Sequence, residues 1–392
     1  MGAPQQLISD QAILRLVILC LRGRWDDSAL MAARVLTEER SLDWDTFLAL
    51  AAAEGLAPLL YAVVRDEGIV PDDVARSLRQ AYDANALRTT FLFHGLETVL
   101  RQLAEVGIDG VLLKGAALAK AVYGRAAVRP AVDLDLLVRP TDASGAIHVL
   151  QGLGYTRVEP EPRAGADLVY ENEVMLSKPG PLDVLLEIHW SLFNSPYYQN
   201  ELPLDWFWET TLRVQVGRTL ARVLGPEAQI LHLCGHLLLH HGGSTGPRML
   251  WLHDVAEVIH FYEETIDWNL LLTQTEACGL VLPVKQVLNR VFEAWRVTIP
   301  DSVLGRLNAL RPSDDEARVF EQMSAGQRPV AQRFWDDLVT MPGWGQRLRY
   351  AMISLFPSAS YMIHRYGIRH PLLLPLYYPY RWYVGLRGML SG

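Results

Sequence analysis

The stretch Val132-Asp133-Leu134-Asp135-Leu136-Leu137-Val138 decides the fold of this chain. Apolar and acidic side chains alternate with a period of two, which predicts a β-strand with two unlike faces. Leu134 and Leu136 would pack on a core, while Asp133 and Asp135 share the opposite face, about 7 Å apart along the strand. Two carboxylates this close repel each other unless a cation lies between them. Mg²⁺ or Mn²⁺, with oxygen ligands, meets that need; the simpler alternative is an edge strand with a solvated acidic face.

Further along the chain, residues 183–190 predict a second strand that carries a third carboxylate. Glu187 and His189 fall on one face of this strand. A helix at about 140–153 and a strand at 168–177 separate it from the acidic strand, so the two acidic faces can become neighbours. Three carboxylates on adjacent strands are the ligand set of a two-metal phosphoryl-type transfer. The alternative for Glu187 is a salt bridge at the end of its strand.

The residues before the acidic strand supply candidate phosphate ligands. A short strand at 111–113 leads into Lys114 and Gly115, followed by a helix to residue 123. A glycine at a strand-to-helix turn lets backbone N–H groups approach a phosphate, and Lys114 can add a charge-assisted contact. Arg125 and Arg129 follow in the loop before the acidic strand. They either steady a triphosphate there or remain surface residues.

Several motifs occur together in this chain: Leu112–Ala119, Tyr123, Arg129, residues 133–138, Gly154-Tyr155 and Glu187-Ile188-His189-Trp190. With these motifs, which are spread over most of its length, the chain resembles the uncharacterised nucleotidyltransferase family of the DNA polymerase beta-like superfamily. The resemblance implies that the Gly115 turn holds nucleotide phosphates, and that Asp133, Asp135 and Glu187 bind two Mg²⁺. Ala116 stands where the superfamily has Ser or Gly, and the interval to Asp133 is longer than is common there.

Helical patterns lie on both sides of this central region. We expect a helical lobe over residues 1–106, a nucleotidyltransferase core over 107–224, and a helical lobe with a tail over 225–392. The predicted fold class is α+β, with a small mixed β-sheet between the two lobes.

The C-terminal lobe contains further candidates. His232, His236 and His240 lie at steps of four on one predicted helix, but the outer two would be about 12 Å apart, too far to surround one tetrahedral zinc ion. Arg248 and Asp254 begin the next helix. We expect them either to form a pair that orients a nucleotide-facing residue or to pack between helices.

The tail from Trp344 is rich in arginine, proline and aromatic residues. It could lie on a membrane surface. Prolines at positions 371, 375 and 379 argue against a long amphipathic helix, so we expect a tail that wraps over the protein's own helices. The polar stretch 311–328 before it is expected to be exposed.

Composition excludes several classes of protein. The chain has 392 residues and a net charge of −8, which argues against bulk nucleic-acid binding. Three scattered cysteines provide neither a disulfide framework nor a cysteine zinc site. We see no signal peptide and no apolar run of the roughly 18 to 20 residues that a transmembrane helix needs. A cytoplasmic location is expected.

Together with the family resemblance, these patterns predict a metal-dependent nucleotidyltransferase that uses Mg²⁺ or Mn²⁺. A nucleoside triphosphate would bind with the metal on Asp133 and Asp135, and an acceptor hydroxyl near Glu187 would attack the α-phosphate and release pyrophosphate. His189 would orient Glu187 or assist proton transfer. The phosphate candidates are Lys114, Gly115, Arg125, Arg129 and Arg248. The alternatives are a phosphotransferase that uses the same site and a catalytically inactive nucleotide-binding module. The acceptor, whether a small molecule, peptide, protein or RNA, stays open.

Overall fold

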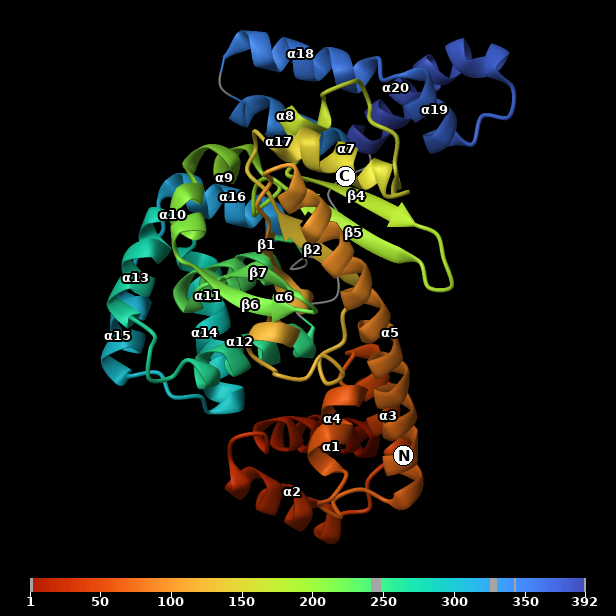
Figure 1. The fold of residues 1–392 in the computed structure, drawn as a ribbon. Coiled ribbons are helices and arrows are strands. Elements are labelled where there is room, and N and C mark those ends of the chain that lie inside the picture. Colours follow the sequence, from red (N-terminus) through yellow and green to blue (C-terminus); the bar gives the residue numbers. More distant parts are fainter. Residues whose placement is uncertain (1–2, 241–247, 325–329, 342, 391–392) are drawn as a thin grey trace.

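A computed structural model describes residues 3–240, 248–324, 330–341 and 343–390 (Figure 1). Its centre is a mixed seven-stranded sheet of order β3-β4-β5-β2-β1-β7-β6. Helices flank this sheet on all sides, which confirms the expected α+β class. The strands are β1 (Val111–Leu112), β2 (Asp133–Leu137), β3 (Thr156–Arg157), β4 (Glu173–Lys178), β5 (Val184–His189), β6 (Thr211–Val216) and β7 (Thr219–Leu224).

The N-terminal part is helical throughout. It consists of α1 (Ala3–Arg22), α2 (Asp27–Glu39), α3 (Trp44–Ala53), α4 (Ala57–Val64) and α5 (Asp72–Glu105). Asp26 and Asp43 cap α2 and α3 by accepting backbone N–H bonds, as acidic residues before a helix are expected to do. The 34-residue α5 runs from these helices to the sheet and carries buried side chains at both ends, so it joins two hydrophobic cores.

The remaining helices either connect the strands or follow them. Those between strands are α6 (Lys114–Ala121), α7 (Ala143–Gly152), α8 (Asp167–Tyr170), α9 (Pro196–Glu201) and α10 (Leu204–Glu209). The C-terminal part contains α11 (Pro226–Gly235), a π-helix (His236–His240), α12 (Met249–Phe261), α13 (Trp268–Ala277), α14 (Val281–Trp295), α15 (Asp301–Ala309), α16 (Asp314–Ser324), α17 (Val330–Thr340), α18 (Trp344–Leu355), α19 (Ala359–Tyr366), the 3₁₀ helix η2 (Pro371–Leu373) and α20 (Leu374–Leu390).

The two faces of β2 belong to different cores, as its alternating sequence predicts. Leu134 and Leu136 pack in a cluster with side chains of α5 and α7. Leu137, on the acidic face, packs in a larger cluster built mainly from α1 to α4 and α11 to α14. The acidic face of the strand is therefore turned toward the C-terminal helices, and any site formed there lies inside the molecule rather than at a solvated sheet edge.

Three expectations are corrected. Residues 168–177 were expected to form one strand, but they begin in α8, and only Glu173–Lys178 pairs with β5. The stretch 311–328 was expected to be exposed; within it, α16 buries Glu316 and Val319, and the Glu316 carboxylate accepts the Leu282 N–H at 2.8 Å. The tail prolines were expected to prevent a long helix, but α20 continues for 17 residues through Pro379.

A buried ion pair holds the C-terminal helices against the sheet region. Arg129 donates to both carboxylate oxygens of Asp254 on α12, at 2.6 and 3.2 Å, and Tyr123 donates to the same carboxylate at 2.8 Å. All three side chains are buried. Gly115 lies directly under the Arg129 guanidinium, where a Cβ would collide with Nη1. The pair therefore depends on a glycine at the first turn of α6.

We predict that Asp254→Ala lowers the free energy of unfolding by about 3 to 5 kcal/mol, because it leaves a buried guanidinium without its counter-charge. The matched control is Asp205→Ala, whose partner Arg139 lies on the surface 3.0 Å away and whose loss should cost at most about 1 kcal/mol. Denaturant unfolding of both variants measures the difference. Equal losses would show that the Arg129–Asp254 pair contributes no more than a surface pair.

Candidate active site

Asp135, Glu187 and His189 meet on the acidic face of the sheet. Strands β2 and β5 are parallel neighbours, and their register places Asp135 directly opposite Glu187. His189 follows Glu187 by two residues and so shares its face. One ligand atom from each of the three side chains lies within 4.8 Å of the others, and all three residues are buried. Pairing of the two parallel strands thus produces a buried cluster of potential metal ligands.

Lys114 supplies a cation to this cluster. Its Nζ lies 2.6 Å from Asp135 Oδ1 and 3.4 Å from Glu187 Oε2. The ammonium group therefore bridges the two strands where the carboxylates would otherwise repel each other. Lys114 is also the first residue of α6 and has a φ of +47°, a left-handed conformation that costs a non-glycine residue about 1 to 2 kcal/mol. The rest of the structure holds this residue in a strained conformation that lets its side chain reach both acids.

His189 is held on both sides of its ring. Nε2 lies 3.1 Å from Asp135 Oδ1, and Nδ1 lies 2.9 Å from Glu173 Oε2, the latter an ion-pair contact rather than a well-directed hydrogen bond. Burial alone would lower the pKa of His189, but the charge of Glu173 and the hydrogen bond to Asp135 raise it well above its ordinary value. The imidazole is therefore fixed in orientation and carries a proton.

The acids of the cluster differ in their protonation behaviour. Burial raises the pKa of Asp133 to about 6, with the charges of Asp135 and Glu187 adding to the effect. Burial also disfavours the charged form of Asp135, but Lys114 and His189 outweigh it and hold the pKa of Asp135 far below its usual range. For Glu173, His189 outweighs burial and lowers the pKa to about 2. When all are ionised, four carboxylates face two cations, which leaves two negative charges uncompensated.

The structure places the other sequence-predicted residues in different surroundings. Asp133 is half-buried on the same face as Asp135, but it lies outside the 4.8 Å group. Arg129 directs its guanidinium to Asp254 instead of an open cleft. Arg125 is exposed in its loop. Arg248 is exposed, and its guanidinium lies 5.2 Å from the centroid of the Trp251 ring. Arg248 was expected to pair with Asp254, but among the described residues the ion-pair partner of Asp254 is Arg129.

One contributor, Glu173, was missed at the level of sequence, and Lys114 was predicted for the site but with a different contact. Glu173 opens β4 and pairs with His189 across two antiparallel strands, which follows from the register and not from any local motif. Lys114 was expected to contact phosphate rather than the carboxylates. The lysine and both acids were recognised individually, but their mutual contact depends on where α6 begins relative to β2.

The histidines of α11 and the π-helix border this cluster. His232 is fully buried, and neither ring nitrogen has a hydrogen-bond partner within the described part of the chain. Burial, together with the nearby positive charges of Lys114 and His189, lowers its pKa well below the ordinary value. The rings of His232, His236 and His240 follow one another with centroids 6.1 and 5.1 Å apart. A row of imidazoles therefore borders the carboxylates, with His232 near Asp135 and His240 near enough to Glu173 for their charges to interact. Its second part is a π-helix, an element that is frequent at functional sites.

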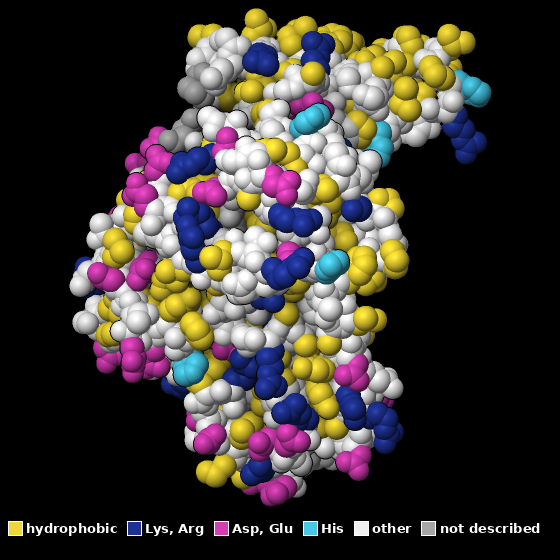
Figure 2. Space-filling view, in the orientation of Figure 1, with side chains coloured by type: hydrophobic (Ala, Val, Ile, Leu, Met, Phe, Trp, Pro, Cys, Tyr) yellow, Lys and Arg dark blue, Asp and Glu magenta, His cyan; other side chains and the backbone are white. Residues whose placement is uncertain are grey.

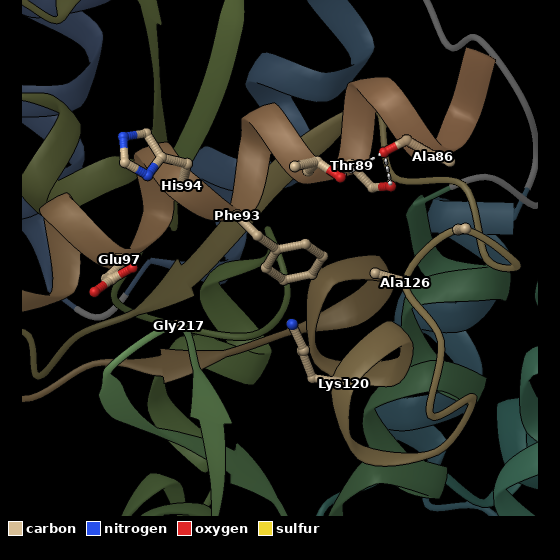
Figure 3. Close-up of a pocket in the computed structure, with 10 residues that line it drawn as sticks. Ala86, Thr89, Phe93, His94, Glu97, Lys120, Ala126 and Gly217 are labelled. Carbon is tan, nitrogen blue, oxygen red and sulfur yellow. Dashed lines mark hydrogen bonds between the residues drawn. The ribbon is translucent and has the colours of Figure 1, made fainter. Parts of the chain in front are cut away.

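A separate cavity of about 350 Å³ lies beside the second half of α5 (Figure 3). It is lined by Thr89, Phe93, His94, Glu97 and Lys120, among others, and the Lys120 ammonium lies 4.4 Å from the centroid of the Phe93 ring. None of its lining residues belongs to the carboxylate cluster. The cavity is thus a feature distinct from the candidate active site.

Comparison with known proteins identifies one family. Residues 40–295 match a protein family described as uncharacterised nucleotidyltransferase. An antigenic nucleotidyltransferase-like protein of solved structure from Paracoccidioides brasiliensis is 13% identical, with 55% of this chain and 96% of that chain covered and a TM-score of 0.35. A likeness at that TM-score does not bear on fold or function. No curated protein matches the chain.

We predict that Lys114→Met lowers the free energy of unfolding by about 3 kcal/mol, because Asp135 and Glu187 then keep only His189 as a counter-charge. The double variant Lys114→Met/Asp135→Asn should recover part of this loss, since one of the two charges is gone. Denaturant unfolding measures both values.

Lys120→Met is the matched control, on the same helix. It removes a cation–π contact and should cost at most about 1 kcal/mol. If both lysine variants are equally stable, or if the double variant loses stability additively, Lys114 does not compensate the carboxylates.

Proposed function

This chain belongs to the family of uncharacterised nucleotidyltransferases, and from that premise we propose that it transfers a nucleoside monophosphate from a nucleoside triphosphate to an acceptor hydroxyl. One observation carries the proposal: Asp135 and Glu187 lie opposite each other on parallel strands and share one bridging cation. Paired carboxylates of this kind can hold the divalent cations that neutralise the negative charge developing on the phosphoryl oxygens during phosphoryl-type transfer. We also assign the chain to the DNA polymerase beta-like superfamily, on the acidic strand β2 and the glycine turn that precedes it.

The donor set fits a divalent cation. Asp135 and Glu187 supply carboxylate oxygens from adjacent strands, and Asp133 supplies a third from the same face. When these three and Glu173 are ionised, their four negative charges exceed the two positive charges of Lys114 and His189. Mg²⁺ and Mn²⁺ prefer such ligands. When bound, the metal would polarise the phosphoryl oxygens and lower the pKa of the acceptor hydroxyl.

In this proposal Lys114 has two positions. Its ammonium bridges Asp135 and Glu187 in the structure, and the same oxygens would ligate the metal. If a divalent ion were held by these oxygens, Lys114 would be free to contact the triphosphate, as a lysine beside a helix N-terminus is placed to do. The strained backbone of Lys114 keeps the side chain at this junction between the acids and the start of α6.

His189 acts as a positioning residue. Its ring contacts Asp135 and Glu187 through Nε2 and Glu173 through Nδ1. These contacts hold the carboxylates of Asp135 and Glu187 in place. Its raised pKa suits this role better than that of a base. We propose that Glu187 or a neighbouring carboxylate accepts the proton that the acceptor hydroxyl loses.

The phosphate-binding side of the site is assigned to four groups. Lys114 and the Gly115 turn lie nearest the acids, and the exposed Arg125 and Arg248 complete the set. Arg129 does not contact phosphate in this proposal; it pairs with Asp254 and so holds α12 against the loop before β2. Residues 107–224 form the catalytic core of this arrangement, and the lobes over 1–106 and 225–392 shape the acceptor side.

We predict that Asp135→Asn and Glu187→Gln each weaken the Mg²⁺-dependent binding of a non-hydrolysable triphosphate by about ten- to a hundredfold, the effect of one lost charged ligand. Calorimetric titration gives the affinities. Asp183→Asn is the matched control, an exposed acid just before β5 that should leave binding unchanged. If the control loses as much affinity as the two cluster variants, the metal does not bind at Asp135 and Glu187.

Products identify the reaction. With triphosphates labelled at either the α- or the γ-phosphate and extracts as a source of acceptors, we predict that the α-label is transferred and pyrophosphate released. Asp135→Asn should abolish the transfer. Transfer of the γ-label with release of a nucleoside diphosphate would replace the proposal with a phosphotransferase, and no transfer of either label by a protein that binds the triphosphate would favour a nucleotide-binding module.

A further inference from the structure

The end of the chain has an extreme composition. Residues 338–392 contain no Asp, Glu or Lys, although the chain as a whole has 44 acidic residues and a net charge of −8. The same segment carries six arginines: Arg347, Arg349, Arg365, Arg369, Arg381 and Arg387. An acidic protein therefore ends in a segment whose formal charge is entirely positive, and such asymmetry indicates a partner of negative charge.

One face of α20 holds this segment together. Tyr378 donates its hydroxyl to the Pro357 carbonyl, Arg381 donates to the Ser354 carbonyl, and the Trp382 indole donates to the Leu355 carbonyl, at 2.8 to 3.0 Å. The helix therefore has a defined inner side, which packs on the end of α18. Helices α18 to α20 lie together at the top of the molecule, beyond the sheet and far from α1 to α4 (Figure 1).

The opposite face of α20 is apolar yet exposed. Leu376, Tyr380, Tyr383 and Val384 recur at helical spacing, and between 45% and 68% of each side chain is accessible to solvent. A helix that packs on its own protein normally turns its apolar stripe inward and its polar stripe outward. The apolar stripe of α20 instead faces solvent.

Further apolar side chains protrude from α18 and η2. Leu372 is 92% exposed, Trp344 is 84% exposed and Leu348 is 67% exposed. In the space-filling view, hydrophobic side chains gather along the top of the molecule over these helices (Figure 2). Arg349, Arg365 and Arg369 are exposed in the same helices and the loop that follows them. We refer to Trp344, Leu348, Leu372 and the outer face of α20, with these three arginines, as the tail surface.

We propose that the tail surface docks onto an anionic lipid bilayer. Protruding leucine and aromatic side chains insert at the interface, and the arginines contact lipid phosphates, which is the pattern of proteins that lie on membranes. None of the described helices has the length and apolar character needed to span a bilayer, so the contact is peripheral.

Charge and shape favour lipid over protein as the occupant. A second copy of the chain would bring one acid-free, arginine-bearing surface against another, and like charges oppose that contact. Side chains as exposed as Leu372 and Trp344 present most of their surface to solvent, and a folded partner would need a matching pocket for each. A fluid bilayer accommodates such side chains without a preformed pocket.

The test uses the full chain and vesicles of either phosphatidylcholine alone or phosphatidylcholine with phosphatidylglycerol. We expect co-sedimentation with the anionic vesicles only, weakening as salt rises. Arg349→Gln/Arg365→Gln/Arg369→Gln should reduce the affinity at least about tenfold, since each basic residue near an anionic surface contributes about fivefold. Leu372→Ser/Leu376→Ser should reduce it by a comparable factor, because two apolar insertions are lost.

Leu87→Ser is the matched control. Leu87 is 71% exposed on α5, outside the tail surface, and its replacement should leave vesicle binding unchanged. No binding of the wild type to anionic vesicles at low salt, or binding that none of the tail substitutions weakens, would overturn the proposal. A concentration-dependent dimer that the same substitutions disrupt, without vesicle binding, would assign the surface to a second copy instead.

Discussion

The contact of the Lys114 ammonium with Asp135 and Glu187 is the interaction on which the centre of the structure depends. Parallel pairing of β2 and β5 brings two buried carboxylates into direct register, which is unfavourable without a positive charge. The positive charge comes from the first residue of the helix after β1, held at φ +47°. The sheet order, the start of α6 and the strain at Lys114 therefore satisfy one electrostatic requirement together.

The same requirement connects the fold to the chemistry. In our proposal, the cluster that needs a cation for its stability also supplies the ligands for a metal ion. Lys114 would then be available to a phosphate. A second buried pair, Arg129 with Asp254, holds α12 against the loop that leads to β2.

Alternation in residues 132–138 was enough to predict β2 and to place Asp133 and Asp135 on one face, and the pattern around Glu187 predicted β5. The register between them could not be predicted, because it depends on tertiary pairing. That register decides that Asp135 and not Asp133 lies in the tightest contact with Glu187.

Local motifs were less informative where a residue has a distant partner. Gly115 and Arg129 carry the pattern of a phosphate site, yet the structure shows a second reason for the glycine: the Arg129 guanidinium lies against it on its way to Asp254, 125 residues further along the chain. The tail prolines carry the pattern of helix breakers, yet Pro375 lies in the first turn of α20, where it is tolerated, and the helix continues past Pro379. The spacing of residues in the sequence predicts neither the contact between Arg129 and Asp254 nor the tertiary packing that allows α20 to continue past Pro379.

Anomalous diffraction from crystals grown with Mn²⁺ and a non-hydrolysable triphosphate tests the central claim most directly. The account predicts a manganese peak about 2.0 to 2.3 Å from carboxylate oxygens of Asp135 and Glu187, with the Lys114 ammonium moved from those oxygens to the triphosphate. Manganese bound elsewhere, for example at the His232 to His240 row, with Lys114 still between Asp135 and Glu187, would contradict it.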